Sequence, residues 1–235
     1  MSRTRALLAV SMVLVALTGC TRKSKKDDVE KVDPNLPAAE GLLKESAAAM
    51  GGIKTAKFLI TADGTIAGVA LKRADGVLTK EGNAQGTAQV EQMGATVELA
   101  FTIVGQTMYL KGPTGDYQQL PLALAASVYD PSAILDPNRG IAKVIGTATE
   151  GKTEASEAVD GQDTYRIAAQ SSAETLVNVV PGVTGKVPGK FWVAKDSKRL
   201  LKAAWTLPAV GDAPGGTVTV TFKEFDAPVT VTAPK

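Results

Sequence analysis

The spacing of apolar residues changes along the chain from helical to strand-like. Apolar residues recur every three or four positions over residues 37–50, which predicts a helix that Gly51 and Gly52 end. From Lys57 onward apolar and polar residues alternate, as they do in half-buried strands. The alternating runs of the first half begin near residues 57, 69, 87, 96 and 106. Gly and Asn residues separate these runs, so we expect an antiparallel meander.

The second half of the chain repeats this mixture. Helical patterns are expected at residues 121–129, 137–147 and 172–180. Asp160-Gly161 lies between two alternating runs and predicts a tight hairpin. Three closing strands are expected at residues 190–195, 199–206 and 217–225. Many strands and few helices indicate a single α+β domain dominated by one antiparallel sheet, with the helices covering one face.

The first twenty residues have the order of an export signal. Two arginines, Arg3 and Arg5, precede a largely apolar run of twelve residues at 6–17, too short for the ~18 of a membrane span. Leu17-Thr18-Gly19-Cys20 resembles the lipobox of bacterial lipoproteins, in which the cysteine is acylated and becomes the first residue. We therefore predict a cleaved signal peptide at residues 1–19 and lipidation of Cys20. The alternative is a free or buried Cys20 beside an ordinary cleavage site.

A charged stretch follows Cys20, and we predict a lipidated flexible tether over residues 20–36. Residues 37–235 would then form the folded domain, exported and anchored to the outer face of the cytoplasmic membrane. Cys20 is the only cysteine, so no intramolecular disulfide can form. The basic residues at 22–26 could lie on anionic headgroups or simply be solvated linker.

Charge and composition exclude several classes of function. Loss of Arg3 and Arg5 leaves 24 basic residues, equal to the 24 acidic ones, so a nucleic-acid partner is not expected. The absence of histidine removes Ser-His-Asp and Cys-His catalysis and the usual zinc ligand. We expect no catalytic residues, no metal and no cofactor. Residues 146–153 match the P-loop pattern, but no buried strand precedes them and no helix follows, so we interpret the match as coincidence.

Four stretches resemble the mycobacterial LppX/LprG-type lipoproteins, a family that includes LprA and LprF. The stretches are Tyr129–Val144, Gly161–Ile167, Val187–Val193 and Ala227–Thr232. The chain departs from the family pattern at Phe225-Asp226, where Trp-Gly is usual, and in a longer segment at residues 207–216. The resemblance covers residues 36–235 and the lipobox.

The resemblance implies a strongly curved antiparallel half-barrel with helices on its concave face around an apolar cavity. Such proteins carry di- or triacylated lipids or glycolipids across the cell envelope, and some act beside a membrane exporter of the major-facilitator type. We expect a monomer. The frequent small apolar residues and the 5% content of aromatics agree with a hollow interior.

Alternation suggests which side chains face the expected cavity, although packed core is the alternative for each of them. The candidates on strands are Ile60, Ala88, Val90, Val97, Leu99, Phe101, Met108 and Leu110. The candidates on helices or in helical segments are Ile134, Leu135, Ile141, Val144 and Leu176.

Two other functions remain open at this point. One is a surface adaptor that binds a transporter or a cell-wall enzyme and whose cavity is incidental. The other is a hydrolase of cell-wall polymers that uses carboxylates alone. Lipid extracted from the purified protein would separate the carrier from the adaptor, and turnover of a glycan would reveal the hydrolase.

Overall fold

The computed structural model describes residues 35–125, 131–180 and 183–235. Residues Val32–Lys235 form one compact unit, to which this description is confined. The predicted signal peptide, Cys20 and nearly all of the predicted tether lie outside the described residues. Within the described residues, no helix is both long and apolar enough to span a bilayer.

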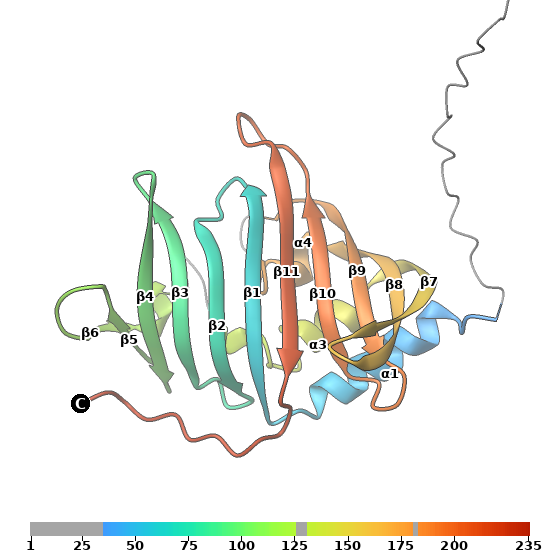
Figure 1. Cartoon of the computed structure of the whole chain (residues 1–235), viewed down its shortest axis with the longest axis horizontal. Coiled ribbons are helices and arrows are strands. Elements are labelled where there is room, and N and C mark those ends of the chain that lie inside the picture. Colours follow the sequence, from blue (N-terminus) through green and yellow to red (C-terminus); the bar gives the residue numbers. More distant parts are fainter. Residues whose placement is uncertain (1–34, 126–130, 181–182) are drawn as a thin grey trace, which may run out of the picture. The chain divides into compact units, whose positions relative to one another are not determined.

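Eleven antiparallel strands, counted over the described residues, form one curved sheet (Figure 1). The first six strands are β1 Thr55–Thr65, β2 Leu71–Thr79, β3 Ala84–Gln92, β4 Ala95–Val104, β5 Thr107–Lys111 and β6 Gln118–Pro121. The other five are β7 Thr149–Val159, β8 Gln162–Ser172, β9 Lys186–Ala194, β10 Leu200–Leu207 and β11 Gly215–Lys223. Their order is β6-β5-β4-β3-β2-β1-β11-β10-β9-β8-β7, so two meanders meet where β1 pairs with β11.

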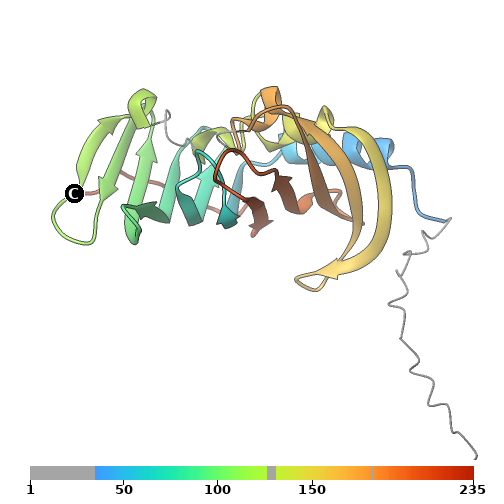
Figure 2. The same cartoon turned by 90° about the horizontal axis from the view of Figure 1, so that it is seen from above.

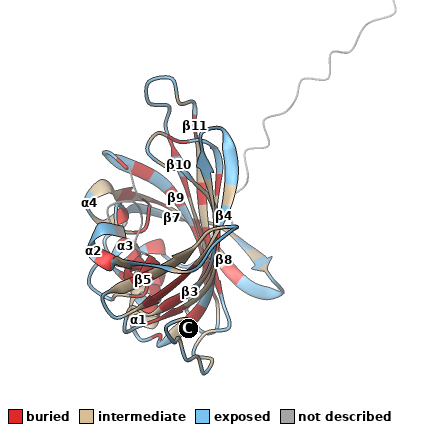
Figure 3. Ribbon diagram, turned by 90° about the vertical axis from the view of Figure 1, so that its left-hand side faces the viewer, coloured by how far each residue is buried: buried red, intermediate tan, exposed pale blue. Residues whose placement is uncertain are grey.

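The helices lie on the concave side of the sheet (Figures 2 and 3). They are α1 Ala39–Gly51, α2 Leu122–Ala125, α3 Ile141–Gly146 and α4 Ala173–Leu176, with a 3₁₀ turn, η1, at Pro131–Ala133. The buried residues, red in Figure 3, lie on the helices and on the strands of the sheet that face them. The predicted α+β class and curved antiparallel sheet are confirmed.

The helix at α3 begins later than the sequence predicts. Asp136-Pro137 has the pattern of a helix start, but Asp136 instead accepts a hydrogen bond from the N–H of Asn138 at 2.8 Å and pairs with Arg139 at 2.9 Å. These contacts close a turn, and the helix begins only at Ile141. The helix predicted at residues 172–180 is also shorter, since α4 has four residues. Of the helix predicted at residues 121–129, α2 accounts for Leu122–Ala125, and residues 126–129 lie outside the described residues. Strand β6 was not predicted.

The C-terminal end of β11 is fastened to the start of β1. Asp226 accepts a hydrogen bond from the N–H of Lys54 at 2.8 Å and forms an ion pair with Arg199. The guanidinium of Arg199 also lies 5.1 Å from the ring centroid of Phe225. The Phe-Asp pair at which the sequence departs from the family pattern therefore holds the junction between the two meanders.

Candidate functional site: an apolar cavity under strands β1 to β5

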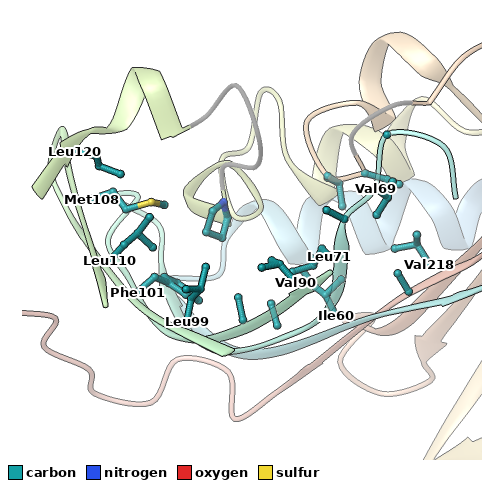
Figure 4. Close-up of a pocket in the computed structure, with 18 of the residues that line it drawn as sticks. Ile60, Val69, Leu71, Val90, Leu99, Phe101, Met108, Leu110, Leu120 and Val218 are labelled. Atoms are coloured by element: carbon teal, nitrogen blue, oxygen red, sulfur yellow. The ribbon is translucent and has the colours of Figure 1, made fainter. Parts of the chain in front are cut away.

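An apolar cavity of about 640 Å³ lies between the inner face of the first meander and the segments that cover it (Figure 4). This volume is within the ~300–1,000 Å³ usual for ligand pockets. All the described residues of the lining are apolar. They are Ile60, Ala62, Gly68, Val69, Ala70, Leu71, Ala74, Ala88, Val90, Leu99, Phe101, Met108, Leu110, Leu120, Leu124, Pro131, Val179, Val180 and Val218.

The register of the strands brings the floor of the cavity together. Ile60 on β1 lies opposite Ala74 on β2, which lies opposite Ala88 on β3, and Ala88 in turn faces Leu99 on β4. Because cross-strand partners point to the same face, these four side chains form one row along the floor. Phe101 opposite Leu110, and Met108 opposite Leu120, extend the wall through β4, β5 and β6.

The floor is hollow because its central residues are small. Ala74, Gly76, Gly86 and Ala88 occupy the inner face of β2 and β3. No large side chain therefore rises from the middle of the meander to meet the covering segments. Under the second meander the space is filled instead, since α1 packs on α3 and β7, and large side chains such as Trp205 are fully buried there.

The closed side of the cavity is made by the segment that follows the 3₁₀ turn and by the end of the α4 region. Pro131, Val179 and Val180 line the cavity and are buried. The segment after Pro131 is held by Gly140, whose N–H donates to the carbonyl of Asp136 at 2.8 Å. The N–H of Ile141 donates to the carbonyl of Ile134 at 2.9 Å. These bonds fix Pro131 above the floor.

The open side of the cavity lies between the β1–β2 turn and α2. Gly68 and Ala70 in the turn and Leu124 on α2 all line the cavity and are exposed to solvent. Leu124 is 67% exposed, a large fraction for a leucine that also faces an apolar cavity. An apolar ligand can therefore enter here without passing a polar barrier.

Charged groups near the cavity serve the fold. Partial burial raises the pKa of Asp136, but the N–H of Asn138 and the guanidinium of Arg139 outweigh burial and lower that pKa overall. None of the described lining residues carries a charged side chain. Among the described residues, no three His, Cys, Asp or Glu side chains are grouped as metal ligands.

Seven of the eight candidates on strands line this cavity. They are Ile60, Ala88, Val90, Leu99, Phe101, Met108 and Leu110. The eighth, Val97, lies opposite Val90 and shares its face, but it is two residues beyond Leu99 toward the β3–β4 turn and outside the lining.

The five candidates from helical segments do not line the cavity. All are almost fully buried in the core, namely Ile134, Leu135, Ile141, Val144 and Leu176. For Ile141, Val144 and Leu176 the reason is position, since α3 packs on α1, both α3 and α4 pack on β8 under the second meander, and the cavity lies under the first. Helical spacing identified a buried face correctly but could not distinguish packed core from cavity wall.

Sequence reasoning did not single out twelve of the nineteen described lining residues. Ala62 continues the alternation of Ile60 and could have been found from it, whereas Ala74 is placed by the pairing of β2 with β1. Val69 and Leu71 have the pattern of a strand start, although they flank a turn at the mouth. Val218 could not be placed, because its approach to β1 depends on the long-range pairing of β1 with β11.

Comparison with known proteins agrees with this geometry. The protein-family model described as LppX_LprAFG lipoprotein matches residues 38–231. The lipoarabinomannan carrier protein LprG of Mycolicibacterium smegmatis is 31% identical over 97% of this chain and 94% of its own. The putative diacylated glycolipid transporter LprF of Mycobacterium bovis is 26% identical over 97% of this chain and 90% of its own.

Solved structures show the same fold. The crystal structure of LprF from Mycobacterium bovis superposes with a TM-score of 0.71 at 25% identity, covering 83% of this chain and 96% of that one. The crystal structure of LppX from Mycobacterium tuberculosis gives 0.63 at 18% identity, covering 83% and 99%. With a family match over most of its length and this shared architecture, the chain belongs to the LppX_LprAFG lipoprotein family.

Proposed function

We propose that this protein is a non-catalytic carrier that takes the acyl chains of a lipid or glycolipid into its cavity and moves them across the cell envelope. The observation that carries the proposal is an open cavity of about 640 Å³ whose described lining residues are all apolar. Such walls gain nothing from a polar substrate but are stabilised by alkyl chains. Burying about ten methylene groups at about 0.8 kcal/mol each supplies about 8 kcal/mol, which corresponds to micromolar affinity before ordering costs.

The headgroup of the cargo would stay at the mouth. A charged or hydroxylated group inside the cavity would lose its water and find no hydrogen-bond partner on the lining, at a cost of several kcal/mol. The names of two relatives, a lipoarabinomannan carrier and a putative diacylated glycolipid transporter, support a glycolipid as the cargo. Lipidation of Cys20, a flexible tether over residues 20–36, a monomeric state and a major-facilitator-type exporter as partner belong to the same proposal.

The proposal is tested by purifying a Cys20→Ser form, which cannot be acylated, and identifying by mass spectrometry the lipids extracted from it. We expect an acylated lipid at close to one molecule per chain. Protein that stays free of lipid, even after incubation with an envelope lipid extract, would contradict the carrier function and favour the adaptor. Glycan turnover by the same preparation would instead revive the hydrolase.

A further inference from the structure

The turns at the two edges of the sheet differ in character. Because the strands alternate in direction, the β1–β2, β3–β4 and β10–β11 turns share one edge, drawn uppermost in Figure 1. Residues 66–70, 93–94 and 208–213 of these turns, here called the apolar rim, contain one charged residue, Asp212. On the opposite edge the β2–β3 and β9–β10 turns are rich in charge, as in Lys80-Glu81 and Lys195-Asp196, whereas the β4–β5 turn at residues 105–106 has no charge. Loops are usually polar, so the uncharged rim needs an explanation.

Met93 is the least expected residue of the rim. It is fully exposed, and its φ of +51° is followed by +78° at Gly94, a two-residue hairpin turn with both φ values positive. Asn or Asp normally takes the first position of such a turn, because long side chains are strained there. Asp160-Gly161 forms the same turn at the opposite edge, with φ values of +48° and +79° and the usual residue. The fold therefore does not account for methionine at position 93.

Val210 presents a second apolar side chain on the rim. It is 53% exposed, in the segment at which the sequence is longer than the family pattern. Its N–H donates to the carbonyl of Ala213 at 2.9 Å, and the N–H of Ala213 donates back at 3.1 Å. The tip is thus a closed turn that holds Val210 outward. Beside it, a shallow apolar groove of about 60 Å³ runs to Ile66 and Ala67.

The rim is continuous with the mouth of the cavity. Gly68 and Ala70 of the β1–β2 turn line the cavity and are also exposed. The charged side chains that flank the rim in sequence, Lys72 and Glu91, form an ion pair at 2.9 Å. The residues that the rim shares with the cavity lining, Gly68, Val69 and Ala70, carry no polar side chain.

We propose that the apolar rim inserts into the headgroup region of a lipid bilayer, so that acyl chains pass between bilayer and cavity without crossing water. The inference rests on the proposed carrier function. A bilayer fits the rim better than a protein partner, because the rim presents separate apolar tips and offers little charge or hydrogen-bonding pattern for specific recognition. The proposed tether of residues 20–36 reaches at most ~60 Å, which keeps the rim close to the bilayer that holds Cys20.

The first test locates the rim in a membrane. Acylation of Cys20, the only cysteine, would leave any introduced cysteine as the sole free thiol. The lipidated protein with Met93→Cys or Val210→Cys is labelled with nitrobenzoxadiazole and reconstituted into phosphatidylcholine vesicles. We expect the fluorescence emission of the label to shift to the blue and to be quenched by spin-labelled lipid at both positions. Neither change is expected for a label at the matched turn, introduced with Asp160→Cys. Rim labels that show no blue shift and no quenching by spin-labelled lipid would overturn the proposal. A blue shift that appears only when membrane protein is added to the vesicles would also overturn it.

The second test separates docking from cargo binding. Met93→Asn with Val210→Asn removes the apolar tips, and Asn favours the positive φ at position 93, so the protein should remain folded. Neither residue lines the cavity. We expect transfer of a fluorescent diacyl lipid between vesicles to slow about tenfold while the amount of lipid bound at equilibrium is unchanged, with Asp160→Asn as the matched control. Unchanged transfer would overturn rim insertion alone, whereas loss of all lipid binding by the unaltered protein would overturn the carrier function.

Discussion

Gly76 on β2 and Gly86 on β3 lie directly opposite each other across the floor of the first meander. A Cβ on Gly76 would lie 2.1 Å from the carbonyl oxygen of Gln85, and one on Gly86 would lie 2.1 Å from that of Asp75. Phe58 on β1 lies opposite Gly76, and Phe101 on β4 lies opposite Gly86. Both phenylalanines are buried. Two glycines thus allow a backbone approach that no other residue permits.

The first prediction concerns this pair. Gly76→Ala should lower the free energy of unfolding by about 1–3 kcal/mol, because the methyl group overlaps backbone atoms that cannot move without disturbing β3. Urea denaturation of the purified protein measures the change.

A matched glycine on α1 provides the control for that experiment. Gly41 is exposed, and no heavy atom lies within 4 Å of where its Cβ would be. Gly41→Ala should raise the free energy of unfolding by about 0.5–1 kcal/mol, since alanine favours the helix. Equal effects of the two substitutions would contradict the steric role of Gly76.

The second prediction concerns Ala88, in the middle of the cavity floor. Ala88→Phe directs a ring into the cavity and displaces at least two methylene groups of the cargo, each worth about 0.8 kcal/mol. Lipid affinity should therefore fall at least about tenfold. Titration with a fluorescent acyl lipid measures it.

A phenylalanine on the other face of the sheet controls for this change. Ala100 on β4 lies next to Leu99 and Phe101 in sequence, so its side chain points away from the cavity. Ala100→Phe should leave lipid affinity unchanged. If both variants bind lipid as well as the unaltered protein does, the cavity is not the binding site.

The sequence predicted the sheet side of the site better than its cover, and the reason is geometric. Side chains of a strand alternate strictly between two faces, so Ile60, Ala88 and Leu99 could be placed on one face from spacing alone. Helical spacing marks a buried face without saying what lies against it. Ile141 and Val144 therefore look like cavity residues in sequence but belong to the packed core.

The remaining parts of the site depend on contacts between distant residues. Val218 reaches the cavity only because β11 pairs with β1, and Val180 only because the chain after α4 returns over the first meander. No local pattern encodes either relationship. The mouth of the cavity was not predicted either. Val69 lies in the β1–β2 turn and Leu71 is the first residue of β2, although both have the pattern of a strand.

The third prediction concerns Gly140, which holds the segment above the cavity floor. A Cβ there would lie 2.3 Å from the carbonyl oxygen of Ile134 and 2.4 Å from that of Ala133. Gly140→Ala should lower the free energy of unfolding by about 1–3 kcal/mol and weaken lipid binding, because the segment that carries Pro131 must shift.

Gly112, in the β5–β6 connection, is the control for Gly140. A Cβ at Gly112 would lie 3.8 Å from its nearest neighbour, the carbonyl oxygen of Thr114. Gly112→Ala should therefore change stability by less than about 0.5 kcal/mol. Lipid binding that survives Gly140→Ala unchanged would show that the covering segment does not shape the cavity.

The last prediction concerns the pH dependence of stability at Asp136. Partial burial acts to raise its pKa in the folded protein, but the N–H of Asn138 and the guanidinium of Arg139 lower that pKa overall. A lowered folded-state pKa means that the ionised carboxylate stabilises the fold above the unfolded-state pKa of about 3.9, and that this contribution is lost as the pH falls through the folded-state value.

Asp136→Asn should therefore lower the free energy of unfolding by about 0.5–1 kcal/mol at pH 7. The difference from the unaltered protein should shrink toward zero below about pH 3. Urea denaturation at several pH values measures it, and Arg139→Gln should lose stability in the same window. A difference that stays constant from neutral to acidic pH would show that the turn depends on the shape of the Asp136 side chain and not on its charge.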